Sequence, residues 1–236
     1  MRWSRARSLA AFGRYNASLV FAGKFVYFLL LALLVFVAVV VVRTAQEAVP
    51  PNAAAIYYYL LVPGMLLVFY PAAYGLQSDV DARMLETLFG IPDYRYRVYL
   101  ARQVVQLLVI AALLAALALL CQVALADFPV GGMVFHLMFP VLFAGSLGFM
   151  LSTLIRSGNG TAAVLVVLAQ VAWILSAGVL EGSSWNVFHN PFEPAESYAA
   201  AMQQATTFHN RAYLLGGAAL AILFGLLRLQ RRERFM

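Results

Sequence analysis

Residues 25–42, FVYFLLLALLVFVAVVVV, form an apolar run without interruption. A helix that crosses the hydrocarbon core of a bilayer needs about 20 mostly apolar residues. This run is too long, and begins too far along the chain, to be the apolar core of a cleaved signal peptide. We therefore expect a membrane anchor that is retained.

The composition of the whole chain extends this interpretation. Of its 236 residues, 64% are hydrophobic and 11% are charged, whereas a soluble globular domain is about 45–50% apolar and about 25% charged. Backbone groups in hydrocarbon must be hydrogen-bonded internally, which favours helices. The sequence therefore predicts an all-α integral membrane protein.

Six segments are long and apolar enough to span the bilayer, and they use up most of the chain. We expect spans at about 25–42, 54–76, 104–126, 131–155, 161–180 and 212–228, in a single transmembrane domain over 1–236. The preceding residues 1–24 are basic and partly amphipathic. Such a segment can lie along the inner leaflet as an interfacial helix, attracted by anionic lipid; the alternative is a basic tail.

The distribution of basic residues predicts the orientation. An even number of spans puts both termini on one side, and of the 16 Lys and Arg residues only Arg43 and Arg211 then fall on the opposite side. Short loops rich in Lys and Arg remain in the cytoplasm. We expect both termini to be cytoplasmic.

Charged residues gather in the cytoplasmic stretch LQSDVDARMLETLFGIPDYRYR, residues 76–97. Ser78 can cap a helix whose first turn carries Asp79 and Asp81, where carboxylates oppose the helix dipole. Gly90 and Pro92 fit positions just past its end. The pattern predicts a short two-faced helix over about 79–89. Its charged face could dock a partner protein; a solvated connector would have the same pattern.

This stretch resembles the segment after the second span in permease subunits of type 2 ABC exporters. The run D-x-R-x-L-E-T-L-x-x-x-P-x-x-R carries the resemblance, with Met84 where the family usually has Gly and with Thr87 after the Glu rather than before it. The order of the other segments along the chain, from the basic N-terminal segment to the long outer segment before the last span, is also similar.

The resemblance implies that 79–89 is a coupling helix seated on an ATP-binding subunit. The residues that it assigns to ATPase docking are Asp79, Asp81, Arg83, Glu86, Thr87, Pro92 and Arg95. It also implies two ATP-binding subunits, a second permease copy as homodimer or related heterodimer, and a place in the bacterial cytoplasmic (inner) membrane. ATP and Mg²⁺ would then be bound by the partner ATPase, with no cofactor on this chain.

Neither the expected spans nor the loops carry catalytic or nucleotide-binding machinery. The only Asp, Glu, Lys or Arg within the six spans as predicted is Arg228, at the very end of the last one, whereas ion-coupled carriers and intramembrane enzymes usually need ionisable groups inside their spans. The single lysine lies in FAGKF (21–25), which lacks the rest of a P-loop. We expect a chain that is not an enzyme and binds no nucleic acid.

The outer segment 181–211 contains two rather apolar stretches separated by Pro191 and Pro194. In the family that the chain resembles, this region dips back into the outer leaflet and roofs the transport path. The candidate gate residues are Glu181, Trp185, Phe188, Phe192 and Tyr198. The alternative for the aromatic residues is an ordinary interfacial belt.

All three histidines, His136, His189 and His209, are expected on the outer side. They are candidate metal ligands, but no HxH or HxxxH spacing occurs, which favours interfacial hydrogen bonding instead.

Two functions remain open at this point. The first is the permease subunit of an ATP-driven exporter, in which a separate ATPase powers alternating access. The tyrosines of span 2, among them Tyr57 and Tyr70, would suit a lipid-like or amphipathic substrate if they line an inner path; the alternative is that they pack against lipid. The alternative is a non-transporting membrane anchor or assembly protein that docks a cytosolic partner through 79–89.

Overall fold

The computed structural model describes residues 25–46, 50–81, 99–155, 157–194 and 200–229, with the side chains of 78–81 left out. These residues form α2 (Phe25–Gln46), α3 (Ala53–Asp81), α5 (Ala101–Ala124), α6 (Val130–Ile155), α7 (Gly158–Ser176) and α8 (Ala200–Arg228). In each of the six, a segment is long and apolar enough to cross a membrane. The predicted all-helical membrane fold with six spans is confirmed at this level.

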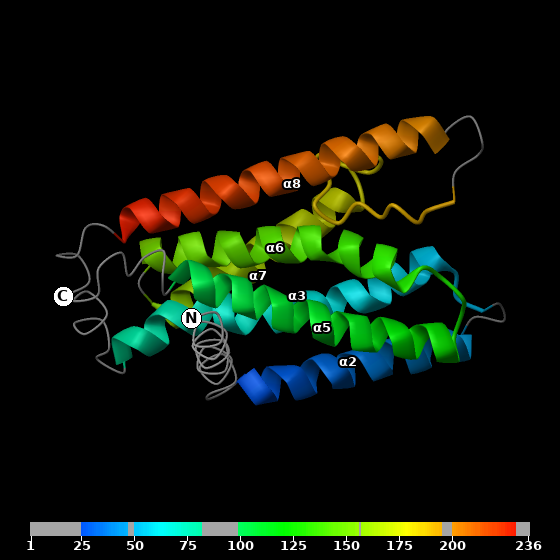
Figure 1. Ribbon diagram of the computed structural model, residues 1–236, viewed down its shortest axis with the longest axis horizontal. Coiled ribbons are helices and arrows are strands. Elements are labelled where there is room, and N and C mark those ends of the chain that lie inside the picture. Colours follow the sequence, from blue (N-terminus) through cyan, green and yellow to red (C-terminus); the bar gives the residue numbers. More distant parts are fainter. Residues whose placement is uncertain (1–24, 47–49, 82–98, 156, 195–199, 230–236) are drawn as a thin grey trace, which may run out of the picture.

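The helices run lengthwise in one bundle (Figure 1). We call the end where α2 begins and α8 finishes the terminal end, and the end where α2 finishes and α8 begins the far end. Helix α3 finishes and α5 begins at the terminal end, whereas α7 finishes and α8 begins at the far end. The described part of the segment after α7, residues 177–194, is therefore on the opposite end of the molecule from the last turn of α3.

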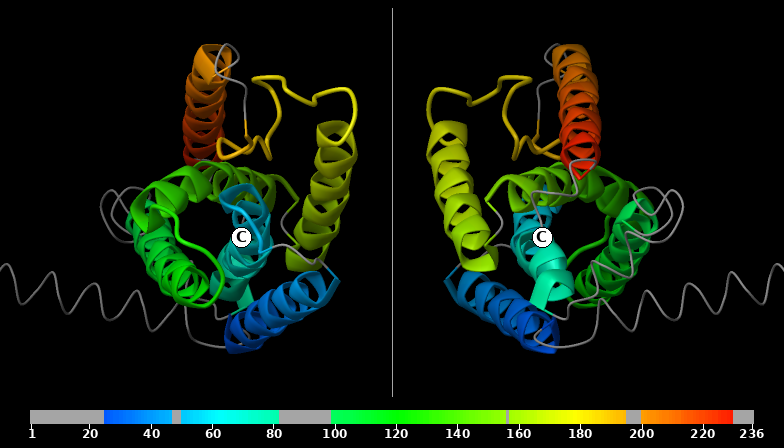
Figure 2. Two further views of the ribbon diagram at one scale, coloured as in Figure 1. Left: turned by 90° about the vertical axis from the view of Figure 1, so that its right-hand side faces the viewer. Right: turned by 90° about the vertical axis from the view of Figure 1, so that its left-hand side faces the viewer.

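Helices α3 and α6 together form the centre of the packing, because α6 contacts α3, α5, α7 and α8 and α3 contacts α2, α5, α6 and α7. Seen end-on, α2, α7 and α8 lie around the group formed by α3, α5 and α6 (Figure 2). Lipid tails are as apolar as the side chains, so close packing rather than exclusion of water holds membrane helices together. Gly148 of α6 shows this, since a Cβ built there would lie 2.6 Å from the Cβ of Ala72 in α3.

The interface between α6 and α8 also depends on glycines that allow close packing. A Cβ built on Gly217 of α8 would lie 2.8 Å from the Phe143 ring, and one built on Gly225 would lie 2.6 Å from the Phe149 ring. The two rings of α6 therefore rest directly on the backbone of α8, which fixes how α8 lies on the bundle.

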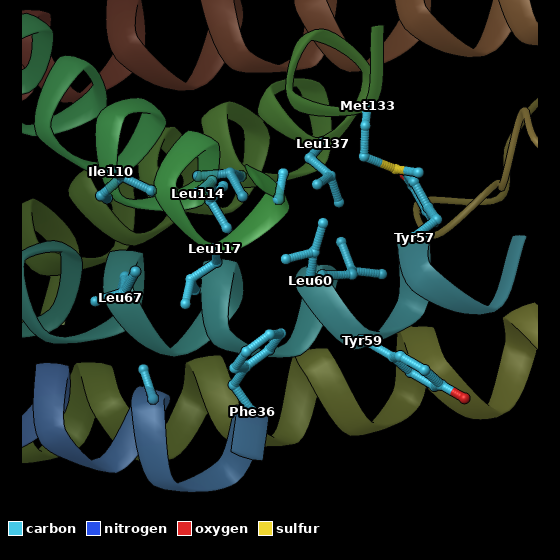
Figure 3. Close-up of a cluster of buried hydrophobic side chains, with 14 of the residues drawn as sticks. Phe36, Tyr57, Tyr59, Leu60, Leu67, Ile110, Leu114, Leu117, Met133 and Leu137 are labelled. Atoms are coloured by element: carbon cyan, nitrogen blue, oxygen red, sulfur yellow. The ribbon is translucent and has the colours of Figure 1, made fainter. Parts of the chain in front are cut away.

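The main core lies between α3, α5 and α6 (Figure 3). Its labelled side chains come from α2 (Phe36), α3 (Tyr57, Tyr59, Leu60, Leu67), α5 (Ile110, Leu114, Leu117) and α6 (Met133, Leu137). Two helices that pass this core begin at caps. Asn52 Oδ1 accepts a hydrogen bond from the Ala55 amide at 2.9 Å, and the Ser157 side chain accepts from the Gly160 amide.

Several helix boundaries differ from the sequence-based expectation, the start of α8 most of all. Helix α8 begins at Ala200 rather than 212, because the alanine, methionine and glutamine residues after 199 are good helix formers. Helix α3 continues through Ser78 to Asp81, so no helix cap separates the span from the start of the predicted 79–89 helix. Helix α7 ends at Ser176 instead of 180.

The longer helices correct the prediction that the spans contain no Asp, Glu, Lys or Arg before the end of the last one. Arg43, Arg102 and Arg211 belong to α2, α5 and α8 respectively. The expected interfacial helix over 1–24 and the remainder of the coupling helix, residues 82–89, lie outside the described residues.

Candidate functional site

The connection between α7 and α8 is folded onto the far end of the bundle (Figures 1 and 2). Its described part, residues 177–194, contains successive turns in which four amides bond the carbonyl three residues earlier: Glu181 to Gly178, Ser183 to Leu180, Asn186 to Ser183 and His189 to Asn186. Non-helical backbone is tolerated at membrane depth only where protein covers it or where it lines a cavity. The contacts of this connection decide its role.

Three asparagines hold the connection in place. Asn186 Oδ1 accepts from the Phe188 amide at 2.9 Å, and Asn190 Oδ1 accepts from the Phe192 amide at 3.0 Å; such turns are a local preference of Asn. Asn190 Nδ2 donates to the Ala54 carbonyl of α3. Asn210 Nδ2 of α8 donates to the carbonyls of Ser184 and Asn186 at 3.0 and 2.7 Å.

Arg211 of α8 completes the attachment. It is only 6% exposed. Its Nε donates to His136 Nδ1 of α6 at 3.4 Å, its Nη1 to Asn210 Oδ1 at 2.9 Å and its Nη2 to the His189 carbonyl at 3.3 Å. The guanidinium also lies 5.4 Å from the ring centroid of Phe139, close enough for a cation–π contact. One side chain thus links α6, α8 and the connection.

The acceptors of Arg211 are neutral groups, so its charge acts on the histidines around it. Burial, the Arg211 charge and His136 together lower the pKa of His189 to about 4. His189 is therefore uncharged at neutral pH. Its Nε2 and Thr207 Oγ1 of α8 are 2.9 Å apart and share a hydrogen bond.

The aromatic residues of the connection pack in two directions. Phe192 lies against Tyr57 of α3 and His136 of α6, with ring centroids 6.1 and 5.7 Å away. Trp185 is exposed and stacks on Tyr213 of α8 at 4.4 Å. The inward-facing ring closes the far end of the bundle, whereas the outward-facing ring covers only the side of α8.

Two cavities adjoin the connection and share a boundary. The apolar chamber has a volume of about 530 Å³ and is lined by α2, α3, α6 and α7 together with Val187 and Phe188. The polar chamber, of about 370 Å³, is lined by residues that include Arg43, Ser176 and Asn186. Trp173 and Phe188 line both chambers, and their ring centroids are 5.6 Å apart.

The structure brings together some of the predicted gate residues and separates others. Phe188 and Phe192 lie at the far end among the helices, whereas Glu181 and Trp185 are exposed. Tyr198 lies outside the described residues. The two inward phenylalanines thus remain candidates for a gate, and the exposed pair is separated from the chambers' shared boundary.

The three histidines do not form one cluster. His136 and His189 both contact Arg211, while His209 is exposed beside Tyr213. Among the described residues, no group of three His, Cys, Asp or Glu side chains could hold a metal ion.

The predicted docking residues are not tested by this geometry. Asp79 and Asp81 belong to the last turn of α3, but their side chains are not described. Arg83, Glu86, Thr87, Pro92 and Arg95 lie outside the described residues. The docking surface remains a prediction.

Arg211 and the three asparagines that fix the connection are not among the site residues predicted from the sequence. A signal for two of them was present, because Asn186 and Asn190 stand four residues apart in an otherwise apolar stretch, and Asn favours side-chain turns. Arg211 was assigned to a loop because the start of α8 was placed too late.

Comparison of the chain with protein-family models, curated proteins and solved structures finds no match.

Proposed function

We propose that the chain is the membrane-spanning permease subunit of an ATP-driven type 2 ABC exporter. A separate ATPase would supply the energy and would dock on the charged stretch at the terminal end. Alternating access would arise when movement of α3 and α5, which flank that stretch, changes their packing on α6.

One observation carries this proposal: the connection at the far end is also a wall of the apolar chamber. Val187 and Phe188 line that chamber, and Arg211 fixes the same segment to α8 and α6. A shift of the helices would therefore change the chamber and its closure together, as alternating access requires. A membrane anchor needs no such space, so the chambers favour transport over the anchoring role.

The proposal is tested by isolating the full chain from its native membrane in a mild detergent. A P-loop ATPase is expected to co-purify with it, and reconstituted vesicles are expected to hydrolyse ATP. Glu86→Arg should reverse the charge on the docking face and uncouple hydrolysis from transport. Glu181→Arg, the same change at an exposed position of the far-end connection, should leave coupling intact.

Two results would reject the permease. The first is a chain that binds no ATPase under these conditions. The second is an ATPase-bound chain whose activity survives substitutions that fill the apolar chamber and is lost only with the docking face. The second result would instead support a docking protein that does not transport.

A further inference from the structure

The two chambers share one aromatic boundary but have different chemistry. The apolar chamber is an open groove whose wall is formed almost entirely by aliphatic and aromatic side chains. The polar chamber beyond Trp173 and Phe188 carries a guanidinium, hydroxyls and an amide, namely Arg43, Tyr58, Tyr59, Ser176 and Asn186. Small-molecule sites commonly have about 300–1,000 Å³ of mostly apolar space with a few polar groups, and both volumes lie in this range.

The dimensions of the groove fit one chain of a lipid-like molecule. Along α3 its lining runs from Leu61 to Ala72, which is about 16 Å at about 1.5 Å per residue. This is close to half of the roughly 30 Å hydrocarbon core. The groove therefore has the depth of a single leaflet, with its polar chamber at the far end, where a headgroup would lie.

The polar chamber favours a headgroup that accepts hydrogen bonds. Arg43 is the charged residue of its lining. The buried Ser176 Oγ has no hydrogen-bond partner within the described part of the chain, and a hydroxyl left unpaired in an apolar setting is costly. None of the described residues that line the chamber is an Asp or Glu, and the Glu193 carboxylate accepts a hydrogen bond from the hydroxyl of the lining residue Tyr58 at 3.1 Å.

From this arrangement we propose that the two chambers form one binding site for a single-chain anionic amphiphile of the long-chain fatty-acid type. The acyl chain occupies the apolar groove, whose lining comes mainly from α3, α6 and α7. The carboxylate lies in the polar chamber, where it accepts a hydrogen bond from Ser176 Oγ and faces Arg43. Trp173 and Phe188 contact the first methylenes. The assignment of this amphiphile as the transported substrate rests on the proposed permease function. The assignment of the two chambers as its binding site does not depend on that function.

Trp173 provides a direct measurement, because it lines both chambers. The chain has three tryptophans, so Trp3→Phe with Trp185→Phe leaves Trp173 as the single reporter. The full chain is reconstituted in phosphatidylcholine nanodiscs without any ATPase. Dibromostearate, whose bromines quench tryptophan fluorescence on contact, is then titrated, and stearate and stearyl alcohol are compared as competitors.

Saturable quenching is expected, with stearate displacing the probe at least tenfold more effectively than the neutral alcohol. Arg43→Gln and Ser176→Ala should each reduce that preference to threefold or less. Ala169→Phe fills the lining of the groove and should abolish saturable quenching. Ala163→Phe is the matched control, since Ala163 is an exposed alanine of the same helix that does not line the groove, and it should bind as the parent does.

Three outcomes would overturn the proposal. Quenching that does not saturate, or that Ala169→Phe leaves unchanged, means ordinary contact with bulk lipid. Equal competition by stearate and stearyl alcohol would show that the site does not select an anionic headgroup. No quenching, with cross-links between copies at α2 and α7, means that a second copy covers the groove. Each can occur while Glu86→Arg still uncouples an ATPase, so failure here is distinct from failure of the permease function.

Discussion

Arg211 of α8 donates a hydrogen bond of 3.3 Å from Nη2 to the backbone carbonyl of His189, 22 residues earlier in the chain. This bond joins a spanning helix to the turns that close the far end of the bundle. Because the same guanidinium reaches His136 and Asn210, one buried side chain joins α6, α8 and the connection, in addition to the hydrogen bonds of the asparagines. We therefore expect far-end stability to depend strongly on this residue.

Arg211→Gln is expected to loosen the connection. A glutamine cannot reach all three acceptors, and hydrogen bonds of charged groups contribute about 1.5–3 kcal/mol each. The free energy of unfolding in mild detergent should fall by at least the contribution of one such bond, about 1.5–3 kcal/mol. Limited proteolysis should cut within 177–194. Arg228→Gln, at the last residue of α8, is the control. Equal proteolysis of both variants would contradict the role assigned to Arg211.

Asn210→Ala tests the same attachment from a second side. The substitution removes the donor to the carbonyls of Ser184 and Asn186, and leaving a buried polar group unpaired costs about 1–3 kcal/mol. Since Asn210 also accepts from Arg211, a double-mutant cycle with Arg211→Gln should give an interaction energy of about 0.5–3 kcal/mol. Additive effects in the unfolding measurements would show that the two side chains act independently.

Acidification is expected to destabilise the far end through His189. The pKa of His189 is about 4 in the folded chain and about 6.5 in the unfolded chain. Between these values the unfolded state binds more protons, so stability falls as the pH is lowered from about 6.5 to 4. His189→Gln removes the titrating ring and should flatten this part of the curve of melting temperature against pH. A slope that persists unchanged in this variant would assign the titration to another group.

The helical membrane fold could be predicted because its signal is local. Runs such as 25–42 are long and apolar enough to identify a span without knowledge of any neighbour. The start of α8 could not be placed correctly in this way, because the polar residues 200–211 are accommodated by partners distant in sequence. Asn210 and Arg211 find their acceptors in the α7–α8 connection and α6.

The site could be predicted only in part for the same reason. Phe188, Phe192 and His189 were identified as members of an apolar outer segment, but the sequence did not reveal which would turn inward. The separation between inward Phe188 and exposed Trp185 follows from the turns that Asn186 fixes. A chamber formed by four helices depends on tertiary packing that no local pattern encodes.

Gly148 and Gly216 look alike in the sequence, since each lies within an apolar helix, but the structure predicts opposite effects of alanine. At Gly148 the new Cβ would lie 2.6 Å from the Ala72 Cβ, and overpacking of this kind costs about 1–3 kcal/mol. At Gly216 nothing lies within 4 Å, and alanine favours a helix over glycine by up to about 1 kcal/mol. Thermal unfolding should therefore show Gly148→Ala melting lower and Gly216→Ala melting at the same temperature or higher. Adding Ala72→Gly to Gly148→Ala restores the space between α3 and α6 and should recover most of the loss. If the second substitution lowers the melting temperature further, the close approach of these helices is not what makes Gly148 necessary.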